Sequence, residues 1–132
     1  MKPKMIWANL AIKDIDRTTK FYTDLGFEFQ GKQTAGGLTS FYFGKDNFVI
    51  NFFLNDKFEN NNHIKAVDAS KENEILFSLS ADSKEEVDGY YQEVKRVGAT
   101  IYAEPEVFEK GYTFGFADPD GHKFNVLYWP GM

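Results

Sequence analysis

Few side chains in this sequence can carry out acid–base or metal chemistry. The 132 residues include two histidines, His63 and His122, and no cysteine. Thiolate catalysis, thiolate metal ligands and disulfides are therefore excluded. His122 follows a tight-turn phrase in the stretch FADPDGHKFN, residues 116–125, where Pro presets the bend and Gly is free to take a positive φ. We expect His122 to cap this turn or to line the rim of the next strand.

The remaining candidates do not assemble into a catalytic set by spacing. His63 lies in a polar stretch and is expected to be a surface histidine, while Glu74, Glu104 and Glu106 are expected to be solvated near strand ends. No histidine is placed beside a serine such as Ser78 in the sequence, so no nucleophile–base pair stands out. A catalytic transition metal needs at least three good ligands. We predict no metal cofactor and assign no catalytic residue.

The composition favours a folded protein that contains strands. Aromatic residues make up 17% of the chain and apolar residues 42%, with fourteen phenylalanines to bury. The net charge is −5 and the basic residues form no run, so nucleic acid is not an expected partner. No apolar run approaches the roughly 20 residues that span a bilayer, and the charged N-terminus does not resemble a signal peptide. We expect a cytoplasmic protein without membrane contact.

Apolar periodicity and turn residues predict the elements of the first half. A strand over 6–12 precedes a helix that begins after Asp14 and stops at Gly26. Three strands follow, over 27–30, 38–44 and 48–54, with a short hairpin loop at 45–47. Residues 55–73 are polar, and we expect a linker there with one or two helical turns near 62–69. A lid over a pocket is the alternative for this segment.

The second half repeats this order. A strand over 74–82 leads to a helix capped by Ser83 or Asp82 and stopped by Gly98. Strands over 99–103, 112–117 and 123–129 follow, with a loop around Pro105. Two pairs of segments align between the halves. The first pair is NLAIKDIDRTTKFYTDLGFEF with FSLSADSKEEVDGYYQEVKRVGATIY, and the second is FYFGKDNFVINFF with FGFADPDGHKFNVLYW. This alignment puts Asn9 over Phe77 and Asn51 over Asn125. Such a repeat predicts two similar sheets that pair and enclose a cavity.

These segments resemble the vicinal oxygen chelate superfamily of glyoxalases, bleomycin resistance proteins and extradiol dioxygenases. The phrase ANLAIKD is most similar to the branch named predicted lactoylglutathione lyase, and DPDGH before an alternating strand is a frequent ending in the superfamily. The resemblance implies an α+β fold of two βαβββ modules that form a cupped mixed sheet. It implies a single domain over 1–132, with module 1 at about 4–55, a polar linker at about 56–73 and module 2 at about 74–130.

The resemblance also implies where a divalent metal would be bound, on the first and last strands of each module. Those positions fall on Asn9, Asn51, Phe77 and Asn125. A neutral amide is a poor ligand for a transition metal, and a phenyl ring is none. The metal-dependent chemistry of the superfamily is therefore not expected in this chain.

The sequence leaves three functions open. The preferred hypothesis is a glyoxalase-like protein that binds or sequesters a small molecule without a metal, as bleomycin resistance proteins do, in a cavity between the modules. The alternatives are a lactoylglutathione lyase-like or dioxygenase-like enzyme with an unconventional metal site, and a dimerisation module without a ligand. We expect a homodimer and an unidentified small-molecule ligand. The candidate ligand-binding residues are Asn9, Asn51, Phe77, Asn125, His122, Phe53, Phe114 and Trp129.

Overall fold

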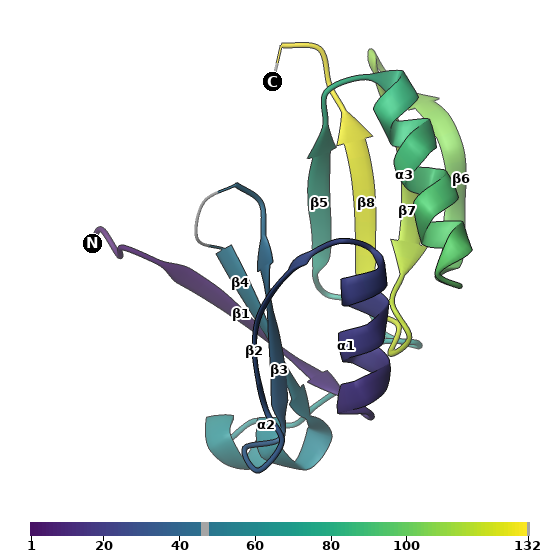
Figure 1. Ribbon diagram of the computed structural model, residues 1–132. Coiled ribbons are helices and arrows are strands. Elements are labelled where there is room, and N and C mark those ends of the chain that lie inside the picture. Colours follow the sequence, from purple (N-terminus) through teal and green to yellow (C-terminus); the bar gives the residue numbers. More distant parts are fainter. Residues whose placement is uncertain (46–47, 132) are drawn as a thin grey trace. The chain divides into compact units, whose positions relative to one another are not determined.

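The computed structural model describes residues 1–45 and 48–131 and divides the chain into two compact units, Met1–Val67 and Asp68–Met132. Within the described residues each unit contains the order strand, helix, strand, strand, strand, which in unit 1 is followed by the helix α2 (Asn55–Asn62), and this confirms the α+β fold with two βαβββ modules (Figure 1). The loop predicted at 45–47 includes Asp46 and Asn47, which lie outside the described residues.

Unit 1 is built on a mixed four-stranded sheet in the order β1-β4-β3-β2. Strand β1 pairs parallel with β4, whereas β3 is antiparallel to both of its neighbours. The elements are β1 (Ile6–Ile12), α1 (Ile15–Asp24), β2 (Glu28–Gln33), β3 (Leu38–Phe43) and β4 (Phe48–Leu54). The parallel pairing requires a crossover between β1 and β4, which α1, β2 and β3 supply.

Unit 2 has the same topology, with strand order β5-β8-β7-β6. Strand β5 pairs parallel with β8, and β7 is antiparallel to β8 and β6. The elements are β5 (Leu76–Ala81), α3 (Lys84–Arg96), β6 (Thr100–Phe108), β7 (Gly111–Ala117) and β8 (Lys123–Tyr128). The strand at one edge of each sheet is therefore the first strand of its module.

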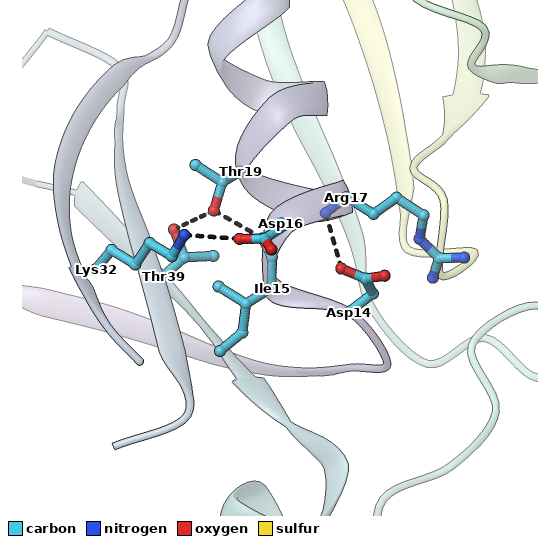
Figure 2. A network of polar contacts seen from close by, with 7 residues as sticks. All are labelled: Asp14, Ile15, Asp16, Arg17, Thr19, Lys32 and Thr39. Atoms are coloured by element: carbon cyan, nitrogen blue, oxygen red, sulfur yellow. Dashed lines mark hydrogen bonds and ion pairs between the residues drawn. The ribbon is translucent and has the colours of Figure 1, made fainter. Parts of the chain in front are cut away.

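Helix α1 is attached to its sheet by polar side chains as well as by packing. The Asp14 carboxylate caps the helix and accepts a 2.9 Å hydrogen bond from the Arg17 backbone N–H (Figure 2). Thr19 Oγ1 donates to the Ile15 carbonyl at 2.7 Å and lies 2.9 Å from Thr39 Oγ1 on β3. A surface ion pair of 2.6 Å joins Lys32 on β2 to Asp16. These contacts orient one face of the sheet towards α1.

The hydrophobic core of unit 1 lies between α1 and this face of the sheet. Tyr22 of α1 stacks on Phe52 with ring centroids 4.7 Å apart and also contacts Phe41. All three side chains are buried, together with Ile12 and Ile50. Because side chains alternate along a strand, the residues between these core positions point to the opposite face of the sheet. We call that opposite surface the open face of unit 1.

Helix α3 covers the corresponding face of unit 2. Its N-cap is Ser83, whose hydroxyl accepts a 3.0 Å hydrogen bond from the Glu86 N–H. Tyr91 packs edge-on against Phe114 at 5.4 Å between centroids, and Phe116 stacks on Phe124 at 5.3 Å. The side chains of β7 and β8 that alternate with this core define the open face of unit 2.

The largest differences from the sequence-based prediction lie in α2 and β6, while β2 (Glu28–Gln33) also runs further than the predicted 27–30. Helix α2 occupies Asn55–Asn62, which is earlier than the turns predicted near 62–69, and it ends at His63 in the left-handed conformation. Strand β6 continues to Phe108, where a loop around Pro105 was predicted. An edge strand tolerates a proline, and the register of β6 shifts between Ala103 and Glu106. No helix in the described part of the chain is long and apolar enough to cross a membrane.

Candidate functional site

A row of hydrogen-bonded polar side chains crosses the open face of unit 1. Asn51 on the central strand β4 is in register with Asn9 on β1 and with Ser40 on β3. Ser40 Oγ donates to Asn51 Oδ1 at 2.7 Å, and Asn51 Nδ2 donates to Asn9 Oδ1 at 2.9 Å. Ser40 is almost fully buried and Asn9 is exposed. We call these three residues the unit 1 polar row.

Unit 2 carries a similar row on its own open face. Ser78 Oγ on β5 donates to Asn125 Oδ1 on β8 at 2.6 Å. Asn125 Nδ2 lies 3.3 Å from Thr113 Oγ1 on β7, and Thr113 donates to the Val126 carbonyl at 2.8 Å. We call Ser78, Asn125 and Thr113 the unit 2 polar row. In both modules an asparagine on the central strand therefore links its two neighbouring strands.

The structural equivalent of Asn9 is Ser78, so the predicted alignment with Phe77 was wrong by one residue. Asn9 is five residues before the helix cap Asp14, and Ser78 is five residues before the cap Ser83. The sequence alignment instead matched Asp14 with Asp82. A shift of one residue moves a side chain to the other face of a sheet. Phe77 accordingly lies on the face covered by α3, with its ring 5.4 Å from Phe124.

The other aromatic candidates divide between the two faces. Phe114 is 1% exposed and belongs to the core under α3, so it does not reach the open face. Phe53 is partly exposed and alternates with the buried Phe52, which puts it on the open face of unit 1 beside Asn51. Trp129 follows β8 and contacts the exposed Phe108, with the Lys110 ammonium 5.7 Å from the indole ring.

The backbone of His122 supports the turn that precedes β8. Its N–H donates to Asp118 Oδ1 at 2.9 Å, and its carbonyl accepts from the Asp118 N–H at 3.0 Å. The same carboxylate oxygen accepts from the Asp120 N–H at 3.0 Å. The buried Asp118 side chain is therefore the group that caps the DPDG turn, and His122 follows it half-buried.

Tyr102 is a residue on the open face of unit 2 that the sequence analysis missed. Its ring lies over Gly115, the position in register with Asn125, where unit 1 has Ser40. A Cβ atom on Gly115 would be 2.4 Å from two ring atoms of Tyr102. The Tyr102 hydroxyl donates to the Phe124 carbonyl at 2.8 Å, and burial raises the pKa of Tyr102. The sequence does contain a sign of this contact, namely Gly115, because a glycine inside a strand often marks a place where another group packs close to the backbone.

Two carboxylates near α3 serve contacts between the helix and the sheet. Glu104 accepts a short hydrogen bond from the Tyr91 hydroxyl, and Asp88 accepts one from Tyr112 at 2.9 Å. These hydrogen bonds raise the pKa of Tyr91 and of Tyr112, since ionising either phenol would put a second negative charge beside the carboxylate. Neither carboxylate belongs to a polar row on an open face.

The polar rows do not fit a divalent transition metal. Among residues 1–45 and 48–131, no group of three or more His, Cys, Asp or Glu side chains lies close enough to hold a metal ion. The equivalent positions carry neutral groups, namely Asn9, Asn51, Ser78 and Asn125. The amide oxygen of each asparagine already accepts a hydrogen bond in the row. A metal would therefore have to displace these bonds and accept ligands without charge.

The sequence matches one family model over residues 4–126, the Glyoxalase/Bleomycin resistance protein/Dioxygenase superfamily. No curated protein matches the chain. A solved structure of the hypothetical protein SA1046 from S. aureus is 28% identical, with a TM-score of 0.84 over 98% of this chain and 96% of that one.

Two further solved structures share the fold at lower identity. A glyoxalase-related enzyme from Fulvimarina pelagi is 17% identical, with a TM-score of 0.82 over 96% of this chain and 88% of that one. A lactoylglutathione lyase from Agrobacterium tumefaciens is 22% identical, with a TM-score of 0.74 over the full length of both chains. At these identities the likeness establishes the fold and not the reaction.

Proposed function

Because the chain belongs to the Glyoxalase/Bleomycin resistance protein/Dioxygenase superfamily, we propose that it is a glyoxalase-like protein that binds a small molecule without a metal ion. The ligand contacts the open face of a unit, and the polar row of that unit orients it. This proposal assigns the protein a sequestering or carrier role of the bleomycin-resistance type.

The observation that carries the proposal is the chemistry of the two rows. At the positions where the resemblance implies metal ligands, each row has amides and hydroxyls that are already bonded to one another. Such a row holds its side chains in one orientation and still presents unused lone pairs and N–H groups to a ligand. Amides on strands are unfavourable when buried without partners, and the bonds within each row supply these partners while leaving other lone pairs and N–H groups for a ligand.

The character of the open faces supports an uncharged ligand. In unit 1 the row is flanked by Phe53 and by Trp7, which is in register with Val49 and 53% exposed. In unit 2 it is flanked by Tyr102. Small-molecule sites are mostly apolar, with a few polar groups that fix orientation. A neutral molecule with a planar apolar part and a few hydrogen-bonding groups matches this combination.

A lactoylglutathione lyase-like activity would require a carboxylate base and a group that stabilises an enediolate. The equivalent positions supply neither, since Asn9, Asn51, Ser78 and Asn125 neither ionise near neutral pH nor fit the metal. The lyase function therefore stands as the outcome that would contradict the proposal.

The proposal can be tested by thermal-shift screening of the untagged protein against a metabolite library, with and without EDTA. We expect stabilising ligands whose effect is the same in both conditions. Asn51→Ala should abolish the shift of ligands that bind unit 1, and Asn125→Ala that of ligands that bind unit 2, whereas Asn60→Ala on the exposed surface of α2 should affect neither. A stabilisation that disappears with EDTA and returns with Zn²⁺ or Ni²⁺ would refute metal-independent binding.

A further inference from the structure

A backbone carbonyl determines which group donates and which accepts in each hydrogen bond of the unit 2 polar row. The Val126 carbonyl can only accept a hydrogen bond, so Thr113 Oγ1, 2.8 Å away, must donate its single proton to it. Thr113 can then only accept from Asn125, which turns Asn125 Nδ2 towards β7 and Asn125 Oδ1 towards β5. The orientation of Thr113 thus determines that of the Asn125 amide, and the Asn125 amide determines whether Ser78 donates or accepts.

Ser78 ends the row as a hydrogen-bond acceptor. Its hydroxyl proton is used in the 2.6 Å bond to Asn125 Oδ1. Ser78 is exposed on the edge strand β5, and the part of its oxygen that remains available carries lone pairs only. A ligand that bonds to Ser78 Oγ without breaking the row must therefore supply an N–H or O–H donor.

Tyr102 supplies an aromatic surface beside the same row. Its ring covers Gly115 on β7, and its hydroxyl is bonded to the Phe124 carbonyl, next to Asn125 on β8. One side of the ring therefore rests on the sheet, and the residue remains 44% exposed. The hydroxyl end of the ring reaches β8, which is the direct neighbour of β5, so it lies one strand spacing, roughly 5 Å, from the strand that carries Ser78. A planar molecule of two fused rings that stacks towards this end of the ring suits that distance.

The unit 1 row ends with the opposite polarity. Ser40 is 2% exposed and no other acceptor for its proton is found among the described residues, so it donates to Asn51. Asn51 then donates to Asn9, and the exposed Asn9 presents amide N–H groups. Ser40 stands where unit 2 has Gly115, and its side chain occupies the position that the Tyr102 ring covers in unit 2. The exposed end of the unit 2 row therefore favours a hydrogen-bond donor on the ligand, and that of the unit 1 row favours an acceptor.

We propose that the open face of unit 2 binds a planar molecule that stacks on Tyr102 and donates a hydrogen bond to Ser78 Oγ. This inference rests on the proposed function and narrows it to a ligand class, namely flat ring systems with an N–H or O–H donor at one edge. A flat molecule whose edge carries only acceptors gains no hydrogen bond from Ser78 Oγ and faces its lone pairs, so it binds this end of the row more weakly.

Indole and benzofuran form a matched pair of probes, since they have almost the same shape and differ by an N–H donor. Each is titrated into the ¹⁵N-labelled full-length protein and followed by two-dimensional NMR. We expect indole to shift the amide signals of Ser78 and Asn125 and to bind about five-fold or more tightly than benzofuran, the usual size of one hydrogen bond. Equal binding of both probes would overturn the inference.

Variants of Tyr102 and Ser78 measure the contributions of the aromatic ring and of the hydrogen-bond acceptor separately. Tyr102→Leu should weaken indole by about five-fold, whereas Tyr102→Phe, which keeps the ring, should weaken it much less. Ser78→Ala should reduce indole to the affinity of benzofuran, and Ser80→Ala, an exposed position two residues along β5, should leave the preference unchanged. Well-dispersed spectra establish that each variant is folded. An unchanged indole affinity in both Tyr102→Leu and Ser78→Ala would overturn the inference.

These outcomes are independent of the test of the proposed function. If indole shifts the NMR signals of the unit 1 polar row only, or no signals, the inference about unit 2 is wrong. This holds even when the library contains stabilising ligands. If stabilisation by library ligands depends on a metal, the proposed function is wrong, whatever indole does.

Discussion

Asn51 and Asn9 face each other across the parallel pair β4–β1, and the Asn51 side-chain amide donates a 2.9 Å hydrogen bond to Asn9 Oδ1. The resemblance to metal-dependent relatives implies metal ligands at both positions. In this chain the two side chains satisfy each other, and Ser40 satisfies the remaining side of Asn51. Where the resemblance implies charged or imidazole ligands, this chain therefore has a neutral pair of side chains bonded to each other.

The bond from Ser40 to Asn51 is expected to stabilise unit 1. Ser40→Ala would leave Asn51 Oδ1 without its donor at a site where Ser40 is almost fully buried. We expect the free energy of unfolding to fall by about 1–2 kcal/mol. Urea denaturation followed by circular dichroism measures the change. The control is Ser80→Ala at an exposed site, which should change the value by less than about 0.5 kcal/mol. Equal effects of the two substitutions would contradict the account.

Gly115 is expected to tolerate no side chain while Tyr102 covers it. Gly115→Ala puts a Cβ atom 2.4 Å from the Tyr102 ring, so the ring must move. We expect a loss of about 1–3 kcal/mol in the free energy of unfolding, as for other overpacked sites. In a Tyr102→Ala background the same substitution should be nearly neutral, and a double-mutant cycle measures the coupling. Additive effects would show that the ring does not rest on Gly115.

The correction of the β5 register predicts opposite phenotypes for two neighbouring residues. Phe77→Ala removes a ring that packs on Phe124, so it should reduce stability by about 2–4 kcal/mol and leave the binding of stabilising ligands unchanged. Ser78→Ala should reduce stability by only about 1 kcal/mol and should weaken binding. Unfolding and titration of both variants test this, and a binding defect confined to Phe77→Ala would favour the original alignment.

Tyr102 makes stability depend on pH in the alkaline range. Burial raises its pKa above the value of about 10 that a tyrosine has in the unfolded chain. Above about pH 10 the unfolded state releases the proton first, so the stabilisation present below that pH is lost as the pH rises through the folded pKa. Tyr102→Phe is less stable than the parent at neutral pH because it lacks the bond to the Phe124 carbonyl.

The difference between parent and Tyr102→Phe should therefore narrow from about pH 8 to about pH 11, as the parent alone loses the contribution of this phenol. Urea unfolding at both pH values measures it. Tyr90, Tyr91 and Tyr112 also have raised pKa values and are present in both proteins, so their effects cancel in the difference. A difference that stays constant would show that Tyr102 titrates normally.

The sequence was sufficient to predict the architecture because local signals agreed with one another. Asp14 and Ser83 both cap helices, and the strand over 48–54 has the predicted bounds. The central asparagines were also found from the sequence, because a polar amide on an apolar strand stands out. The alignment of two short strands could not show on which face of the sheet each side chain lies. It was shifted by one residue, and this shift put Phe77 in the place of Ser78.

The remaining differences arise from tertiary contacts. Tyr102 was missed because its role depends on Gly115, thirteen residues away and on another strand. The extension of β6 through Pro105 depends on that strand being at an edge of the sheet. The homodimer, the cytoplasmic location and the identity of the ligand stay predictions, because each depends on a partner or compartment beyond the chain itself.

The metal content of the untagged protein distinguishes metal-independent binding from a metalloenzyme. Elemental mass spectrometry after incubation with Zn²⁺, Ni²⁺, Mn²⁺ or Fe²⁺ and desalting measures it, and a histidine tag must be absent because it would bind these ions. The neutral rows around Asn51 and Asn125 predict retention far below one equivalent of every ion. Stoichiometric retention of one ion would contradict the account and would identify the protein as a metal-binding member of its superfamily.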